Sequence, residues 1–338
     1  MELYCGIDLH STNSYVVVAD ESDRAVFQGR LVNDLGVILR ALAPFADRLA
    51  GVVVESTYNW YWLVDGLQEA GFRVHLANPA AIQQYDGLKY TDDRSDAAWL
   101  ARLLRLEVLP EGYIYPKAER GLRDLLRRRG QLVRQRTANL LAIQTQATRS
   151  TGRRLSAERI KTLDAAEVDE LVGAGDVALS VRSNLAVLRA LEAEVAALER
   201  VVLSRARPRP EFELLQTVGG IGKVLALTIL LETGDIARFA GPGNFASYCR
   251  CVASKRISNA KKKGEGNRKC GNKHLAWAFV EAAHFAIRYE PRAERFHARK
   301  KAKTNAIVAR KALAHKLARA CYYVMRDQVA FSAERCFG

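Results

Sequence analysis

The sequence predicts an α/β domain followed by mainly helical segments. Its first 110 residues alternate β-rich runs with runs of helical spacing, whereas the residues after 116 show almost only helical spacing. A proline-marked stretch, ARPRPEF at 206–212, separates a long helical pattern from a glycine-rich one. The length of 338 residues suits two domains of ordinary size. We therefore expect an α/β domain over 1–115, a basic helix and coiled-coil segment over 116–205, and a helical domain over 206–338.

The patterns of the first part predict a mixed sheet with helices around it. Two β-rich runs flank the turn-like DESDR and predict a hairpin, and the continuous run GVVV predicts a buried strand that ends at Glu55. The expected strands are 3–7, 15–19, 25–31, 51–54 and 72–76, and the expected helices are 35–49, 60–70 and 93–106.

The middle part predicts two long helices. Residues 117–150 have a helical apolar pattern, and eight Lys/Arg against two acids lie between Lys117 and Arg136. Over 177–203 the apolar residues follow one another at spacings of 4, 3, 3, 4, 3 and 4, close to a heptad seam with one slip. This second segment is long enough for a coiled-coil arm or for an antiparallel helix pair, and the sequence leaves both open.

The last part begins with VGGIGK at 218–223, between two apolar helical runs. Its glycines permit a tight turn, so the segment predicts a helix-hairpin-helix whose second helix offers amide groups to a phosphate. A plain glycine-turned helix pair is the alternative. Further on, 252–275 predicts a cationic loop with eight Lys/Arg against one acid, and 295–326 predicts one amphipathic helix with ten Lys/Arg and no acid.

Charge is divided unequally along the chain. The formal net charge is +15, but residues 1–115 carry 9 Lys/Arg against 16 Asp/Glu, while residues 116–338 carry 43 against 21. A basic surplus of this size predicts a polyanionic partner. No apolar run is long enough for a membrane span, the first residues lack a signal-peptide pattern, and six cysteines are too few for a disulfide scaffold. We therefore expect a cytoplasmic protein that binds nucleic acid and no membrane.

Four acidic residues of the expected α/β domain lie at positions where a metal site can form. Asp8 follows the first expected strand, Glu55 follows the central one, and Asp93 and Asp96 lie three residues apart on one face at the start of a helix. Carboxylates brought together repel one another, and divalent cations relieve that repulsion. Because Mg²⁺ prefers carboxylate and phosphate oxygens, we expect the four acids to bind two Mg²⁺ ions that stabilise a phosphoryl transfer.

Helix capping is the alternative explanation for these acids. Acids at strand ends often cap helices or face water, and Asp93 can be an N-cap with Asp96 in the first turn. Asp92 competes with Asp93 for the third position, and we choose Asp93 because its spacing to Asp96 gives the facing geometry. His10, two residues after Asp8, is a further candidate near the site.

Cations and glycines of the basic parts are the expected nucleic-acid contacts. Such groups hold phosphates without reading sequence, and contact with about eight phosphates gives a salt slope of about −7. The expected contacts are Arg127, Arg128, Arg129, Gly220, Gly222, Lys223, Lys261, Lys262, Lys263, Arg268, Lys269, Lys273, Lys300 and Lys301. Ser254 and Ser258 lie within the cationic loop, where a hydroxyl beside metal-bound phosphate can act as a nucleophile.

Taken in order, these motifs resemble the DEDD transposases of the IS110 insertion-sequence family. GIDLH contains the first acid, VVVEST the second, and TDDRSDAAWLA the pair. LLQTVGGIGKVLALTILLETGDIARFAGPGNFASYC resembles the helix-hairpin-helix transposase domain of that family, and ISNAKKKGEGNRKCGNKHL resembles its serine-containing, glycine-rich block. The resemblance covers nearly the whole chain, and the order and spacing of the motifs are more specific than any one of them.

The resemblance implies an RNase H/RuvC-like first domain with Asp8, Glu55, Asp93 and Asp96 as catalytic Mg²⁺ ligands. It also implies that Ser258 is the nucleophile and forms a phosphoserine link to DNA. It further implies a bridge RNA, encoded by the flanks of the element, that pairs with donor and target DNA. Homodimers or homotetramers assembled through 177–203 are implied as well. The family has Ser-Gly where Ser258 is followed here by Asn259, so Ser254 remains a second candidate.

Three functions follow from this reading of the sequence. The leading hypothesis is an insertion-sequence transposase, a recombinase that performs RNA-guided DNA cleavage, exchange and religation with a Mg²⁺-assisted serine. One rival is a Mg²⁺-dependent junction-resolving nuclease that uses water as its nucleophile, and the other is a non-catalytic nucleic-acid-binding scaffold. The ordered acids, together with a serine in the most cationic loop, favour an enzyme.

Overall fold

The structure is a computed structural model that describes residues 1–82, 92–254, 256–264 and 270–338. Its internal contacts divide the chain into two compact units. Unit 1 comprises Met1–Ala118 and Ser254–Cys270, and unit 2 comprises Glu119–Ala253 and Gly271–Gly338.

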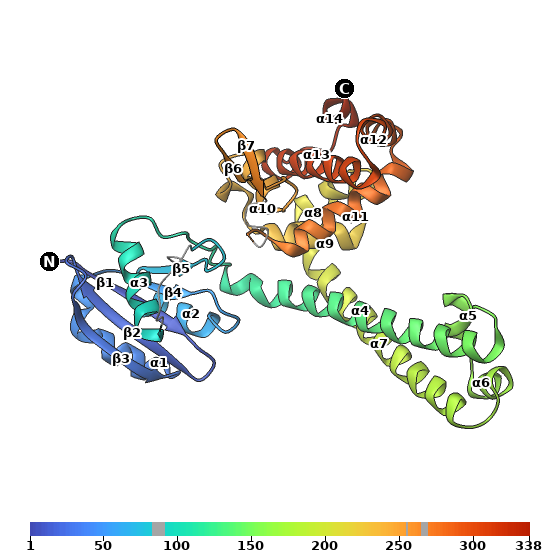
Figure 1. Cartoon of the computed structure of the whole chain (residues 1–338), viewed down its shortest axis with the longest axis horizontal. Helices are drawn as coiled ribbons and strands as arrows, with labels where there is room; N and C mark the ends of the chain where they lie inside the picture. The colour runs from blue at the N-terminus through green and yellow to red at the C-terminus, as the bar shows by residue number, and fades with distance from the viewer. Residues whose placement is uncertain (83–91, 255, 265–269) are drawn as a thin grey trace. The chain divides into compact units, whose positions relative to one another are not determined.

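Unit 1 is built on a five-stranded mixed sheet, coloured blue to cyan in Figure 1. The strands are β1 Leu3–Leu9, β2 Asn13–Asp20, β3 Ala25–Val32, β4 Leu49–Glu55 and β5 Val74–Ala77, in the spatial order β3-β2-β1-β4-β5. β1, β2 and β3 pair antiparallel, whereas β4 and β5 add in parallel. This order is RNase H-like, and it confirms the predicted α/β class and the predicted hairpin.

The two faces of β1 are covered by different helices, because alternate residues of a strand point to opposite sides. Leu3, Cys5 and Ile7 pack in one core with the helices α1 Leu35–Leu42 and α2 Tyr61–Glu69. The other face, which carries Gly6 and Asp8, lies under α3 Asp93–Arg105.

Gly6 sets the distance between α3 and the sheet. A Cβ atom at this position would lie 2.0 Å from the carbonyl oxygen of Ala97 and 2.8 Å from the backbone nitrogen of Ala101. Ala97 and Ala101 are themselves fully buried, so glycine on the strand and alanine on the helix let the two backbones meet almost directly. The start of α3 is therefore held close to the carboxyl end of β1.

The helix predicted over 35–49 is shorter than expected. The α-helix α1 ends at Leu42, and the 3₁₀ helix η1 Ala43–Arg48 follows it before β4 begins. Pro44 explains the change, since it has no backbone N–H to continue the helical ladder.

Two long helices, α4 Lys117–Thr151 and α7 Asp176–Ala206, run antiparallel beside each other (Figure 1). Gln146 of α4 donates a hydrogen bond to Ser180 of α7 at 2.6 Å. The seam residues Val181, Leu185 and Leu188 share a buried cluster with α4 and with the short helices α5 Ala157–Thr162 and α6 Ala165–Val172. The segment with heptad-like spacing is therefore one continuous helix, and α4 is its antiparallel neighbour.

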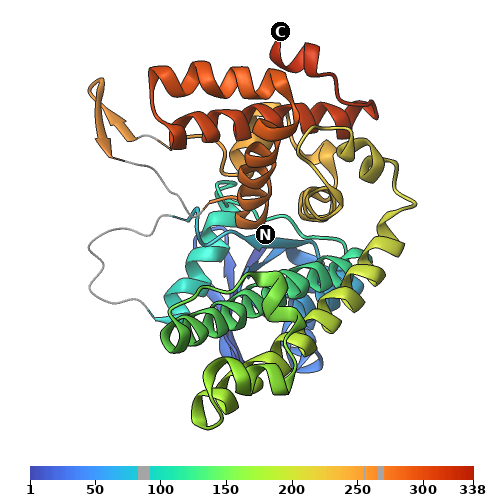
Figure 2. The same cartoon turned by 90° about the vertical axis from the view of Figure 1, so that its right-hand side faces the viewer.

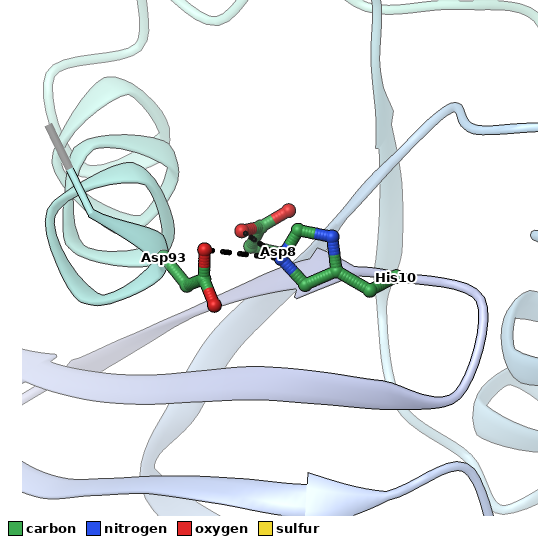
Figure 3. A group of neighbouring side chains, drawn as sticks. All are labelled: Asp8, His10 and Asp93. Atoms are coloured by element: carbon green, nitrogen blue, oxygen red, sulfur yellow. Dashed lines mark ion pairs between the residues drawn. The ribbon is translucent and has the colours of Figure 1, made fainter.

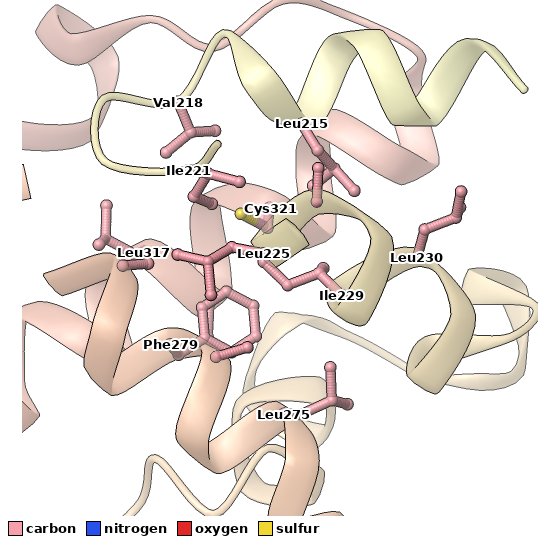
Figure 4. Packing of buried hydrophobic residues seen from close by; sticks show 14 of the residues in the cluster. Leu215, Val218, Ile221, Leu225, Ile229, Leu230, Leu275, Phe279, Leu317 and Cys321 are labelled. Carbon is pink, nitrogen blue, oxygen red and sulfur yellow. The ribbon is translucent and has the colours of Figure 1, made fainter. Parts of the chain in front are cut away.

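The rest of unit 2 is a helical domain with one large core (Figure 4). Its elements are α8 Pro210–Gln216, α9 Lys223–Thr233, η2 Ile236–Arg238, α10 Pro242–Tyr248, α11 Lys273–Tyr289, α12 Pro291–Lys303, α13 Ala306–Asp327 and α14 Ala333–Phe337. Helix α9 is buried from Leu225 to Thr233 because it is apolar on nearly every side, and it therefore occupies the centre of the domain.

The single basic helix predicted over 295–326 is wrong, because the segment forms two helices. These helices, α12 and α13, pack against each other and lie side by side at the top of Figure 2, in orange-red and red. The break falls at Thr304 and Asn305, where the Asn305 side chain accepts a hydrogen bond from the backbone N–H of Val308 and so starts α13 anew.

The cationic loop predicted over 252–275 contains an unexpected hairpin. Strands β6 Arg256–Ser258 and β7 Lys261–Gly264 pair antiparallel around the residues Asn259 and Ala260. Both turn residues have positive φ angles, 50° and 58°, as a two-residue type I′ hairpin turn requires. Across both units, no helix in the described part of the chain is long and apolar enough to cross a membrane.

Candidate active site

Asp8 and Glu55 meet because they end neighbouring parallel strands. Ile7 lies opposite Val54 in the β1–β4 register, so the next residue of each strand emerges at the same carboxyl edge of the sheet. The two carboxyl groups lie close enough for each to influence the pKa of the other. Asp8 is only 4% exposed, so the pair lies at the border between the core and solvent.

Helix α3 brings two further acids to this edge. Asp92 caps the helix, since its carboxylate accepts a hydrogen bond from the backbone N–H of Ser95 at 2.8 Å and its own N–H donates to Ser95 Oγ. Asp93 is then the residue that meets Asp8, and Asp96 lies within the range of both charges. Capping therefore accounts for Asp92 and leaves Asp93 for the cluster. We call Asp8, Glu55, Asp93 and Asp96 the acidic cluster.

His10 lies between two members of the acidic cluster (Figure 3). Its Nε2 atom is 3.1 Å from Asp8 Oδ2 and 3.2 Å from Asp93 Oδ1. One ligand-type atom from each of these three residues lies within 4.8 Å of the other two. The imidazole therefore adds a nitrogen donor to a set of carboxylate oxygens.

Arg30 of β3 belongs to the same site, although the sequence analysis missed it. Its Nη2 atom lies 2.6 Å from Asp93 Oδ2, the oxygen that does not face His10. Asp8 lies opposite Tyr15 and Tyr15 opposite Arg30, so the three form a row across β1, β2 and β3. The guanidinium carbon lies 5.9 Å from the centroid of the Tyr15 ring. Counting outward from the DESDR turn would not have found Arg30, because a β-bulge between Val18 and Ala19 shifts the register of this hairpin by one residue.

The pKa values of the acidic cluster reflect the burial and closeness of its carboxyl groups. Burial, the closeness of the Asp8 carboxyl group and the negative charges nearby raise the pKa of Glu55 well above its usual range. Burial also raises the pKa of Asp8, although the nearby His10 acts to lower it. The pKa of Asp96 is raised mainly by burial and further by the negative charges of Asp8 and Asp93. Burial would raise the pKa of Asp93 as well, but Arg30 and His10 lower it. Three of the four carboxyls thus hold their protons more firmly than in water.

This donor set fits a hard divalent cation. Oxygen donors from several carboxylates in a half-buried site attract such ions, and a dication would offset the repulsion that raises the three pKa values. While Arg30 is paired with Asp93 Oδ2, Asp93 can offer only its Oδ1 atom to a metal ion. The arrangement can therefore bind a metal ion and present it to a phosphate.

Comparison with known protein families matches both ends of the chain. The model of the DEDD transposases of the IS110 group matches residues 5–151, and the model described as "Transposase IS116/IS110/IS902 family" matches residues 212–298. The chain belongs to the IS110 family of transposases. It is therefore a DNA phosphoryl-transfer enzyme with a DEDD domain at one end and a helical transposase domain at the other.

Two curated relatives resemble the transposase over most of its length. "Putative transposase y4qE" of Sinorhizobium fredii is 24% identical over 310 residues, which cover 86% of this chain and 73% of that protein. "Probable family 20 transposase" of Pseudomonas aeruginosa is 24% identical over 245 residues, which cover 70% and 71% of the two chains.

Ser258 of the transposase ends strand β6, directly before the two-residue turn, and its side chain is exposed. Lys261 and Lys263 of β7 are exposed as well. The left-handed conformation of Asn259 accounts for the departure from Ser-Gly, since glycine and asparagine are the residues that adopt it most readily. Ser254 precedes the hairpin and is half-buried.

The three arginines at 127–129 have different surroundings. Arg127 makes two hydrogen bonds to the Glu232 carboxylate, at 2.6 and 2.7 Å, and the Glu232 side chain is only 1% exposed. Arg129 Nε lies 2.8 Å from Glu199 Oε1. Arg128 is exposed and bonds only to Gln131 of its own helix among the contacts described. Two of these three predicted contacts are therefore held by acids of the transposase itself.

The glycine hairpin between α8 and α9 also has a packing role. Gly220 has a φ angle of 96°, and a Cβ there would lie 2.4 Å from the backbone nitrogen of Ala286 in α11. Gly222 borders open space at the start of α9, where Lys223 is exposed. Gly220 is thus required by the neighbouring helix, whereas Gly222 and Lys223 face outward.

The remaining predicted contacts divide by location. Lys273 begins α11, and Lys300 and Lys301 lie in the last turns of α12; all three are exposed. Lys262 belongs to strand β7. Arg268 and Lys269 lie outside the described residues.

Proposed function

We propose that this transposase is an RNA-guided DNA recombinase in which Ser258 and Mg²⁺ ions bound by the acidic cluster cleave, exchange and religate DNA strands. The observation that carries the proposal is the meeting of Asp8, His10 and Asp93 beside Glu55 at one edge of an RNase H-like sheet. Exposure of Ser258 on a lysine-bearing hairpin supports its part in the reaction.

In the proposed reaction the Ser258 hydroxyl gives up its proton, and its oxygen forms a bond to a DNA phosphorus. The bond from that phosphorus to the leaving deoxyribose oxygen breaks, and the leaving oxygen takes up a proton. A hydroxyl of the incoming strand then attacks the same phosphorus and releases the serine. One phosphodiester is exchanged for another, so religation needs no nucleotide cofactor.

The acidic cluster prepares the site for this chemistry. Bound Mg²⁺ supplies positive charge for the phosphoryl oxygens in the transition state. Asp8 and Glu55 hold fixed positions at the strand ends, while Arg30 and His10 orient the two oxygens of Asp93. His10 is also placed to exchange a proton with its carboxylate neighbours, which are about 3 Å away.

Ser258 can be tested directly with the full-length protein, Mg²⁺ and a DNA substrate carrying the ends of the element. We expect the wild-type chain to form a covalent protein–DNA species that survives denaturation. Ser258→Ala is expected to abolish that species and slow cleavage by at least about 10³-fold, because it removes the nucleophile itself. Ser254→Ala is the matched control and is expected to retain both.

The same assay distinguishes the rival functions. Full cleavage by Ser258→Ala, with no covalent species in the wild type, would overturn the serine mechanism and favour a nuclease that uses water. Unchanged activity of Asp8→Asn and Glu55→Gln would instead indicate a non-catalytic scaffold.

RNA guidance is the proposed source of sequence recognition. Lys and Arg side chains bind phosphates of any sequence, so base pairing by a guide RNA would supply the specificity that these contacts lack. Purifying the protein from cells that carry the complete element is expected to recover an RNA from the flanks of the element. Recovery of only random cellular RNA would contradict guidance.

Assembly as a homodimer or homotetramer is proposed to use helix α7. Its seam is buried within the chain, but Leu179 and Val187 remain 62% and 46% exposed on the same helix. Light scattering of the full chain is expected to give a dimer or tetramer, and Leu179→Glu with Val187→Glu is expected to give monomers. An unchanged mass for the double variant would exclude this surface as the contact.

A further inference from the structure

Helix α13 has two faces of different character. One face is buried in the core of unit 2 through residues such as Leu313, Leu317 and Cys321. The other face lines a hollow of about 1150 Å³ that also borders α12, α14 and the segment 250–253. This volume is slightly above the range of about 300–1,000 Å³ for small-molecule sites, so the hollow is large enough to accept a planar ring with its substituents.

Small and cationic residues alternate along the open face of α13. Its residues in the hollow follow helical spacing, and they are Val308, Lys311, Ala312, His315, Lys316, Arg319, Ala320, Tyr323, Val324 and Asp327. Alanine side chains are shorter than the lysine and arginine side chains beside them. We therefore take the alanines as the floor of the hollow and the cations as its sides.

Three cations of the hollow have no acidic partner among the residues that the structure describes. In the described part of the chain, no carboxylate lies within ion-pair distance of Lys311, Lys316 or Arg319. Of the described residues that line the hollow, Asp327 is the only acid, and Arg326 Nε lies 2.6 Å from its Oδ1 atom. A concave surface lined by unpaired cations concentrates anions.

Aromatic rings give the hollow surfaces for stacking. Phe296, Tyr323 and Phe331 line it, and Tyr323 is 41% exposed. The Lys316 ammonium lies 5.4 Å from the centroid of the Phe296 ring. The Tyr323 ring also has the Arg326 guanidinium carbon 4.9 Å from its centroid. Cations beside partly exposed aromatic rings are the combination by which proteins hold single-stranded nucleic acid, with bases stacked on rings and phosphates on cations.

We propose that this hollow binds an unpaired nucleotide of a single-stranded nucleic acid, with its base over Ala312 and Ala320 and its phosphates on Lys311 and Arg319. This inference rests on the proposed function, because it takes nucleic acid as the substrate. It goes further by assigning a binding site to an unpaired base. Bases of a duplex are stacked within the helix and cannot enter a hollow of this kind without being extruded.

Binding of short fluorescent oligonucleotides to the full-length protein tests this site without any metal ion. The probes are a five-nucleotide oligouridylate, a five-nucleotide oligothymidylate, an abasic five-mer with the same phosphates, and a short duplex. We expect base-bearing single strands to bind about tenfold more tightly than the abasic strand, as expected for about 1.4 kcal/mol of stacking on one base. Preference between uridylate and thymidylate identifies RNA or DNA as the source of the nucleotide.

Ala320→Leu fills the floor of the hollow and is expected to abolish the tenfold difference while leaving binding of the abasic strand unchanged. Ala298→Leu, an exposed alanine of α12 that does not line the hollow, is the matched control and should retain the difference. Tyr323→Ala, which keeps the backbone and removes the ring, provides an independent variant and should also lose it.

The phosphate contacts have their own control. Lys311→Ala with Arg319→Ala is expected to weaken binding of all single strands at least tenfold, whereas Arg200→Ala with Arg205→Ala, two exposed arginines of α7, removes the same charge elsewhere and should have less effect. Equal binding of base-bearing and abasic strands by the wild type would overturn the proposal, and so would an intact difference in both Ala320→Leu and Tyr323→Ala. Either result would leave the metal-dependent cleavage assay, and with it the proposed function, unaffected.

Discussion

The acidic cluster of unit 1 and the cationic face of α13 in unit 2 are both concentrations of like charge, but they are built differently. The acids are fixed by backbone geometry, since Asp8 and Glu55 end paired strands and α3 lies almost directly on Gly6. The cations are carried on long side chains along one helix, with small residues between them. A metal ion with a defined coordination geometry requires ligands fixed by the backbone. A flexible polyanion can be bound by cations on long, mobile side chains.

The comparison also shows that equal charges in a sequence have unequal roles. Arg127 is held by the buried Glu232, which lies 105 residues away, while the adjacent Arg128 is exposed. Lys311 and Arg319, in contrast, have no acidic partner in the described residues. Net charge indicates a polyanionic partner, but only the three-dimensional contacts show which cations are available to it.

The largest effect is expected from removing one charge of the acidic cluster. Asp8→Asn should slow strand cleavage by about 10³-fold, because the transition state loses charge stabilisation at the metal site. Thermal unfolding in the presence of a chelator should not be destabilised, since burial already raises the pKa of Asp8 and its charge is unfavourable in the metal-free fold. Asp47→Asn, at an exposed acid outside the cluster, is the control for both measurements. Unchanged cleavage by Asp8→Asn would remove the cluster from the mechanism.

A second prediction compares the neighbouring arginines by their effect on stability. Arg127→Ala should lower the free energy of unfolding by about 3 kcal/mol, because it leaves the buried Glu232 carboxylate without its cation. Arg128→Ala should change it by less than about 0.5 kcal/mol. Urea unfolding followed by circular dichroism measures both. Similar losses in the two variants would show that the ion pair has no special structural role.

The close contact of α3 with β1 is tested by Gly6→Ala. The added methyl group would meet the backbone of Ala97, so the helix must move and the free energy of unfolding should fall by about 2 kcal/mol. Because Asp93 moves with the helix, the affinity for Mg²⁺, measured by calorimetry, should fall as well. Gly29→Ala is the control, since a Cβ at that position meets nothing closer than 3.5 Å. Normal Mg²⁺ affinity in a folded Gly6→Ala protein would contradict this account of the site.

The smallest effect concerns Glu232 and pH. Burial alone would raise the pKa of Glu232, but the hydrogen bonds and charge of Arg127, with Asn272, lower it overall. Its contribution to stability is therefore complete above the unfolded-state pKa of about 4.3 and is lost as the pH falls through the lower folded-state value. Urea midpoints measured from pH 6 to pH 3 should decline more steeply for the wild type than for Glu232→Gln. Parallel curves would exclude this contribution.

Sequence patterns were sufficient for features that depend on neighbouring residues. Strand runs and the DESDR turn predicted the hairpin, and the ends of two strands placed Asp8 and Glu55 at one edge. Residue roles within the acidic cluster stay a prediction, although the geometry separates Asp92, which caps α3, from Asp93, which faces His10.

Features that depend on distant contacts could not be predicted in this way. The contact between Gly6 and Ala97, like the ion pair of Arg127 with Glu232, joins segments that only the folded chain brings together. The break between α12 and α13 was missed for a different reason. Asn305 is a good N-cap, but it is a single local signal within a basic pattern that continues on both sides of it.

The short hairpin that carries Ser258 has little stability of its own. Its strands contain only 3 and 4 residues, and an isolated two-stranded ribbon of this size is marginally stable in water. Ala260 in a left-handed conformation adds to the cost of keeping it formed. On the proposed mechanism, bound nucleic acid must therefore supply the free energy that orders the nucleophile.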